Sequence, residues 1–183
     1  MGFIFTGATG QRDRTGKLWN GQLDTNGQVI DLWSRYAVDP SNRTNYDFSF
    51  NFKHDFKDNR GNLMLDANQS IGEEHTQGYY TNTYYTPDTV ELNQAKIEQQ
   101  LFNIDKNLIT TAQADLTYLF PDLGIRTEAG LKAILRDQLV DTYSESRDTI
   151  SQLFIEDTLA NFLYGYKEQI FSAYGVVSKQ FNR

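Results

Sequence analysis

The chain has 183 residues, a formal net charge of −7, no cysteine and two histidines. The acidic balance argues against a surface that neutralises nucleic-acid phosphates, and the lack of cysteine excludes disulfides, thiolate metal sites and cysteine nucleophiles. No stretch approaches the roughly 18–20 consecutive apolar residues of a transmembrane helix, so a membrane-spanning form would have to be a β-barrel.

The first half of the chain contains the clearest strand pattern. Residues 2–10 are expected to form a strand, and residues 28–38 form either another strand or an ordered part of a long loop. Residues 45–56 read NYDFSFNFKHDF, in which aromatic and polar side chains alternate, with His54 as the one break in the aromatic row. Because successive strand side chains point to opposite faces, this pattern predicts a strand with one aromatic and one polar face.

Two hairpins follow from the same alternation. A turn at 57–61 leads into a partner strand at 62–71, and strands at 111–120 and 124–136 flank a Pro-Asp-Leu-Gly turn at 121–124. The polar, tyrosine-rich stretches 72–95 and 143–167 are expected to be long loops, and residues 168–181 a last strand. We therefore predict an all-β fold over residues 1–183: an antiparallel meander of six or seven strands in one unit.

Two environments suit such alternating strands, a soluble sandwich and an outer-membrane barrel. Strand length, the alternation of short and long connections, and a polar face of mixed charges and amides favour the barrel. The residues predicted to face lipid are Tyr46, Phe48, Phe50, Phe52, Leu63, Leu65, Leu116 and Leu131, together with Ala112, Ala114 and Ala133. Those predicted to face the lumen are Asp47, Asn51, Lys53, Asp66, Asn68, Gln113, Asp115, Glu128, Lys132 and Arg136.

No catalytic, metal-binding or cofactor-binding residues are predicted, and we expect no enzymatic reaction. Glu73, Glu74 and His75 are expected to lie in a solvated loop, because no further histidine or spaced carboxylate supports a metal site. Four loop tyrosines are candidates for either loop packing or contact with a ligand. They are Tyr79, Tyr80, Tyr84 and Tyr85.

Three segments resemble successive strands of the outer-membrane β-barrel family typical of Bacteroidetes, which is allied to TonB-dependent receptors. The segments are YDFSFNFKHDFKDNRGNLMLDANQS, TTAQADLTYLFPDLGIRTEAGLKAILR and YKEQIFSAYGVVSKQF, and the resemblance spans residues 40–183. It implies an outer-membrane location, contact with outer-membrane lipid, and a large barrel with an internal plug. It also implies import of bulky solutes, energised by an inner-membrane complex through a periplasmic partner.

The sequence departs from that family in having no plug domain and no TonB box. Six or seven strands are also fewer than the roughly eight of the smallest single-chain barrels and the roughly 22 of outer-membrane transporters. The chain is therefore expected to be a segment of a barrel wall. Two alternatives stay open: a barrel that anchors or binds at the cell surface without transport, and a soluble carbohydrate-binding module that uses Trp33 and the loop tyrosines.

Overall fold

The computed structural model describes residues 1–94 and 96–179. Within these residues, the chain forms a single antiparallel sheet with two single-turn 3-10 helices, and no helix there is long and apolar enough to cross a membrane. The elements in chain order are β1 (Gly2–Leu23), β2 (Val29–Asp55), η1 (Lys57–Asn59), β3 (Gly61–Tyr85), β4 (Ile97–Phe120), η2 (Pro121–Leu123), β5 (Ile125–Arg147), β6 (Phe154–Glu156) and β7 (Phe162–Lys179).

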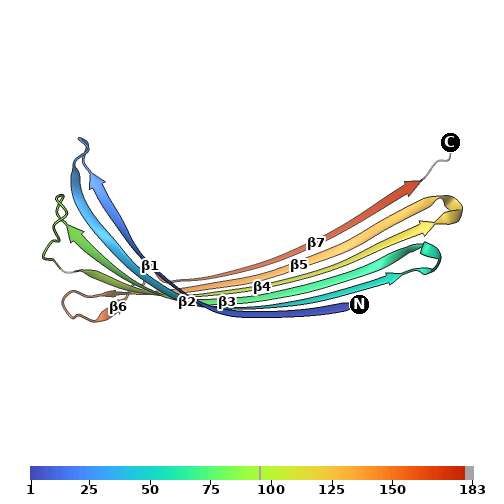
Figure 1. Cartoon of the computed structure of the whole chain (residues 1–183), viewed down its shortest axis with the longest axis horizontal. Coiled ribbons are helices and arrows are strands. Elements are labelled where there is room, and N and C mark those ends of the chain that lie inside the picture. Colours follow the sequence, from blue (N-terminus) through green and yellow to red (C-terminus); the bar gives the residue numbers. More distant parts are fainter. Residues whose placement is uncertain (95, 180–183) are drawn as a thin grey trace.

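The sheet is a meander in which each of the first five strands pairs with the next. The short β6 and the long β7 both pair with β5, at different positions along it. Figure 1 shows a strongly curved sheet in which the start of β1 and the end of β7 lie at the same end as η1 and η2. The predicted all-β antiparallel meander is thereby confirmed, and residues 29–38 of the segment 28–38 belong to β2.

Residues with positive φ form the two short turns. Asp58 and Asn59 have φ values of 57° and 52°, and Gly61 follows at 133°. Gly124 closes the second turn in the left-handed conformation, with φ 61°. These are the conformations that Asp, Asn and Gly tolerate best, so both predicted turns are confirmed and set the register of their hairpins.

The two predicted long loops are wrong over most of their length. Residues 72–85 continue β3, residues 143–147 end β5, and residues 162–167 begin β7. The five longest strands have 22–27 residues. Hydrophobic alternation fades in these stretches because both faces carry polar residues there, although the backbone hydrogen-bond ladder continues.

The described part of the chain has no hydrophobic core. None of its hydrophobic side chains is buried, and the buried residues are Gly78, Gly130 and the small hydroxyl residues Ser34, Ser41, Thr142 and Ser144. A single sheet leaves both faces uncovered, and within residues 1–94 and 96–179 β1 and β7 each have one edge without a partner strand. The predicted alternative of a two-layer soluble sandwich therefore has no second layer in this structure.

Candidate functional site

Strand register separates the predicted lipid-facing and lumen-facing residues onto opposite faces of the sheet. Directly opposite residues of an antiparallel pair share a face. One cross-strand row consists of Phe52, Leu65, Ala114 and Leu131. The neighbouring row on the other side consists of Asn51, Asp66, Gln113 and Lys132.

We call these sides the apolar face and the polar face. Every residue predicted to face lipid lies on the apolar face, and every residue predicted to face the lumen lies on the polar face. The structure thus shows that each predicted set lies on one face of the sheet. It remains a prediction that the apolar face contacts lipid and that the polar face contacts water.

The apolar face is most hydrophobic near the short turns. On β3 its residues from Leu63 to Ile71 are apolar except for Gln69, and Glu73 is the next residue on that face. About ten residues in strands tilted as in a barrel cover a height of roughly 25 Å, the height of the apolar band of outer-membrane barrels. The strands are thus more than long enough to cross the hydrocarbon layer.

Ion pairs follow this band on the same face, and we call them the charged row. Glu73 lies 3.0 Å from Lys106 on β4, and Asp137 on β5 lies 2.9 Å from Lys167 on β7. Hydrogen bonds from Lys106 and then from His75 lower the pKa of Glu73 below its ordinary value. The charged row lies where the face changes from apolar to polar.

The prediction that Glu73, Glu74 and His75 form a solvated loop is wrong, because all three lie in β3. Glu73 and His75 share the apolar face with a contact of 2.8 Å, whereas Glu74 lies on the polar face. No group of three or more histidine or carboxylate side chains in the described residues could hold a metal ion.

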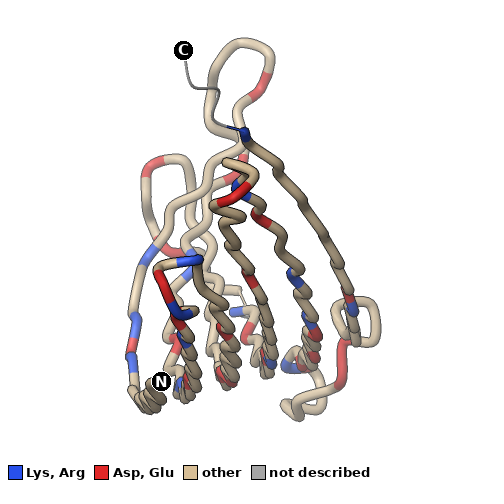
Figure 2. The backbone as a smooth tube through the Cα atoms, turned by 90° about the vertical axis from the view of Figure 1, so that its right-hand side faces the viewer, with Lys and Arg blue, Asp and Glu red and all other residues tan. Residues whose placement is uncertain are grey.

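Hydrogen bonds and ion pairs connect side chains on the polar face, some within one strand and others between strands. Asn51 on β2 donates to Asp66 on β3, and the Tyr174 hydroxyl on β7 donates to Asp115 on β4 over 2.8 Å. Figure 2 shows basic and acidic residues interspersed along the strands. Three cations of this face are ion-paired at 2.8–3.1 Å: Lys53 with Asp55, Arg126 with Glu128, and Arg136 with Glu168.

The four candidate tyrosines lie in β3 rather than in a loop, so their prediction as loop residues is wrong. Tyr80 and Tyr84 lie on the polar face, and Tyr79 and Tyr85 on the other. The Arg35 guanidinium lies 4.2 Å from the centre of the Tyr80 ring. Partial burial, and then a hydrogen bond to Asp39, raise the pKa of Tyr80 to about 12.

Two of these tyrosines are held by neighbouring side chains. Tyr80 is in contact with the Arg35 guanidinium. The Tyr85 hydroxyl accepts a hydrogen bond from Ser34, and the Tyr85 ring lies 4.7 Å from the Trp19 ring. A role in ligand contact for the four tyrosines stays a prediction.

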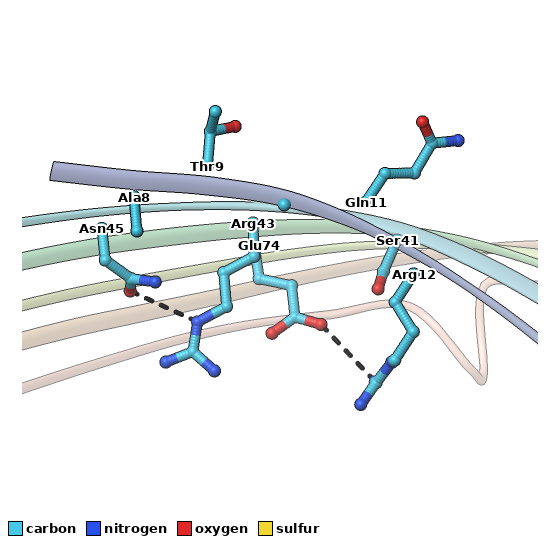
Figure 3. A pocket seen from close by; sticks show the side chains of 9 residues that line it. Ala8, Thr9, Gln11, Arg12, Ser41, Arg43, Asn45 and Glu74 are labelled. Atoms are coloured by element: carbon cyan, nitrogen blue, oxygen red, sulfur yellow. Dashed lines mark hydrogen bonds and ion pairs between the residues drawn. The ribbon is translucent and has the colours of Figure 1, made fainter.

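A pocket of about 290 Å³ opens on the polar face between β1, β2 and β3. Figure 3 shows Arg12, Arg43 and Glu74 projecting to this side of the sheet, while Thr9 and Gln11 project to the other. The Arg43 Nε donates to the Asn45 side-chain oxygen at 3.2 Å, and an Arg12 nitrogen lies 3.9 Å from a Glu74 oxygen.

The sequence predictions gave no role to Arg12 or Arg43 and placed Glu74 in a solvated loop. The polar parity of residues 45–55 extends back along β2 through Arg43 and Ser41, which was the one local signal available. Arg12 and Glu74 belong to segments whose faces both carry polar residues, so alternation alone does not assign them to a face.

A meander of long amphipathic strands, open at both edges within the described residues, with an apolar band and a polar face, is the wall of a transmembrane β-barrel. A family model described as the outer membrane protein beta-barrel family matches residues 54–183, and the chain belongs to that family. Its location is accordingly the outer membrane, which decides against the soluble module. No curated protein matches the chain.

Proposed function

We propose that this chain forms part of the wall of an outer-membrane receptor-transporter allied to TonB-dependent receptors, which takes up a bulky solute. The polar face lines the passage, and the apolar face contacts outer-membrane lipid. In this proposal, the chain performs no chemical reaction and needs no cofactor. Its contribution is to guide a solute along charged and amide side chains.

The observation that carries the proposal is the length and composition of the polar face. On β2 this face continues from Lys53, beside the short turn, through Asn51 and Arg43 to Arg35 near the other end of the strand. A hydrated surface with charges of both signs over the full strand length is typical of a barrel lumen. An inert anchor would need no comparable set of ligand-binding groups.

The open sheet supports a larger barrel around this segment. Unpaired strand edges are prone to aggregate, and barrels remove them by closure. We therefore infer that β1 and β7 pair with further strands of a parent protein. The parent would also supply the plug and the contact with the inner-membrane energising complex.

Uptake measurements in cells test this function. A strain lacking the parent gene is compared with its complemented strain for growth on a panel of bulky nutrients, with and without the energising complex. We expect at least one nutrient whose use needs both the parent protein and that complex. Growth that is the same in all strains on every nutrient would contradict the transport proposal.

A second candidate is a barrel that binds at the cell surface without transport. The observation in its favour is the projection of the strands beyond the charged row, where β3 continues from Glu74 to Tyr85. Such a barrel would bind its ligand on whole cells equally well with or without the energising complex, and no ligand would accumulate inside.

A further inference from the structure

We propose that the pocket formed by Arg12 and Arg43 on the polar face is a subsite for an oxyanion, a carboxylate or a phosphate group, on the transported solute. The inference rests on the proposed function, because it names a chemical class of solute that the polar face would take.

The strand register brings the two arginines onto one face, one strand apart. Arg43 on β2 lies opposite Gly10 on β1, and Arg12 lies opposite Ser41. The two arginines are therefore diagonal neighbours, whose backbones lie about 7–8 Å apart. At that separation, two long arginine side chains can reach the same small anion.

Arg43 differs from the ion-paired arginines of the sheet. Arg126, Arg136 and Arg147 each lie 2.6–3.1 Å from a carboxylate oxygen. Arg43 forms no ion pair within the described residues, and it donates a hydrogen bond to Asn45 through Nε. Its two terminal nitrogens point away from the strands into the open side of the pocket (Figure 3).

Arg12 is held only weakly. Its contact with Glu74 is 3.9 Å long, and its side chain is 74% exposed. At such a distance and exposure, an ion pair contributes little to stability, so an incoming oxyanion can compete for the guanidinium. The fork of N–H donors on arginine matches two oxygens of a carboxylate or phosphate.

The small residues around the arginines leave space for this group. Ala8, Gly10 and Ser41 line the same pocket, and a methyl group added at Gly10 would meet no atom within 4 Å. A bulky residue opposite Arg43 would fill the space in front of its guanidinium. The pocket is thus open beside the two guanidinium groups, which lie on either side of the Glu74 carboxylate (Figure 3).

Calorimetric titration of the full-length parent protein in detergent tests the subsite. The probes are citrate for carboxylates and inorganic phosphate for phosphate groups, with glycerol as the uncharged control. We expect the wild type to bind at least one of the two anions and not glycerol. Arg43→Gln and Arg12→Gln should each weaken that binding by about tenfold or more, because each removes charge-assisted hydrogen bonds.

Arg14→Gln is the matched control, since Arg14 lies on the same strand and face as Arg12 but does not line the pocket. It should weaken anion binding less than twofold. If Arg14→Gln has the same effect as Arg43→Gln, general electrostatic attraction explains the binding and the subsite is wrong. Absence of anion binding by the wild type also overturns it.

Arg43→Lys keeps the charge and loses the planar fork, so it should bind anions less tightly than the wild type and more tightly than Arg43→Gln. If Arg43→Gln does not fold, Arg43→Lys is used in its place. Equal anion affinity of Arg43→Lys and the wild type would overturn the subsite. Energy-dependent uptake with no anion binding would overturn the subsite alone. Anion binding without any energy-dependent uptake would overturn the transport proposal alone.

Discussion

Phe50 and Asn51 are neighbours in sequence that lie on opposite faces of the sheet. Phe50 belongs to the apolar face and borders a shallow groove over Ala67 and Ala112, whereas Asn51 donates a hydrogen bond to Asp66. The same charged substitution at these two positions therefore distinguishes the environments of the two faces.

We expect Phe50→Lys to lower the free energy of unfolding of the parent barrel by about 2–4 kcal/mol, since a cation on the lipid face near the bilayer midplane is costly. Asn51→Lys should cost much less, because Asp66 and water surround the new ammonium group. Denaturant titrations in lipid vesicles measure both. Equal costs at the two positions would contradict the assignment of the faces.

Gly130 lies between Asp115 and Tyr174 in the sheet, and its lack of a side chain lets the Tyr174 hydroxyl reach the Asp115 carboxylate. A methyl group at Gly130 would lie 2.2 Å from the Tyr174 ring and 2.5 Å from the Asp115 carboxylate. We expect Gly130→Ala to cost about 1–3 kcal/mol through overpacking. Adding Tyr174→Ala should recover part of that loss, because the clashing ring is then absent.

The control for this pair is Gly165→Ala. Gly165 lies in the same β5–β7 ladder, but its added methyl group would meet its nearest atom only at 4.0 Å. Its folding free energy should change little in the same denaturant titrations. Additive effects of Gly130→Ala and Tyr174→Ala would show that the two sites do not interact.

At the scale of the element, the β4–β5 hairpin depends on its turn. Gly124 has φ 61° and closes η2, a conformation in which a side chain costs about 1–2 kcal/mol. Gly124→Ala should therefore destabilise the barrel by about that amount. Gly16→Ala should leave the stability unchanged, because Gly16 lies in the extended strand β1 and no atom is near the added methyl group. Similar losses of stability for the two variants would show that the left-handed conformation of Gly124 is not the cause.

The charged row should make the β3–β4 pair sensitive to acid. The pKa of Glu73 is lowered in the folded protein, so its ion pair with Lys106 contributes above the ordinary glutamate pKa of 4.5 and is lost as the pH falls through the lowered value. Glu73→Gln should be less stable than the wild type at pH 7.

That difference should disappear at a pH below the lowered pKa of Glu73, where the wild-type carboxyl is protonated. Urea titrations of both proteins across this range measure the difference. A gap between the two proteins that stays constant with pH would show that the ion pair with Lys106 does not stabilise the folded state.

At the scale of the whole molecule, a sheet without a core requires a partner for its surfaces. Large apolar side chains are exposed on it, including Phe3, Leu131 and Phe171 at 64–70%. Without lipid or detergent, these residues and the unpaired edges of β1 and β7 would associate. We expect residues 1–183 alone to be insoluble or aggregated in buffer.

Light scattering and circular dichroism check this expectation with and without detergent. A monodisperse, folded chain in plain buffer would contradict the membrane assignment. A detergent titration that increases strand content and decreases scattering together would support it.

Alternation in the sequence was sufficient to assign the two faces in residues 45–71 and 111–136. One face there is almost entirely apolar, as in the row from Phe48 to Phe52, so a period of two is visible in a single strand. Turn chemistry at Asp58 and Gly124 likewise marked both hairpins correctly. From Glu73 to the end of β3, and again at the end of β5, the alternation disappears, and the sequence suggested loops where both strands continue.

By itself, the sequence determined the all-β class, the two short turns and the faces of the central strands, because these depend on local backbone preference and the two-residue period of a strand. Only the tertiary structure decided that the strands extend far past the apolar band and that Arg12, Arg43 and Glu74 share a pocket. Arg12 and Arg43 lie about thirty residues apart in sequence, as do Arg43 and Glu74. The pairing of the hairpin strands sets the register of these long ladders, and that register brings the three residues together.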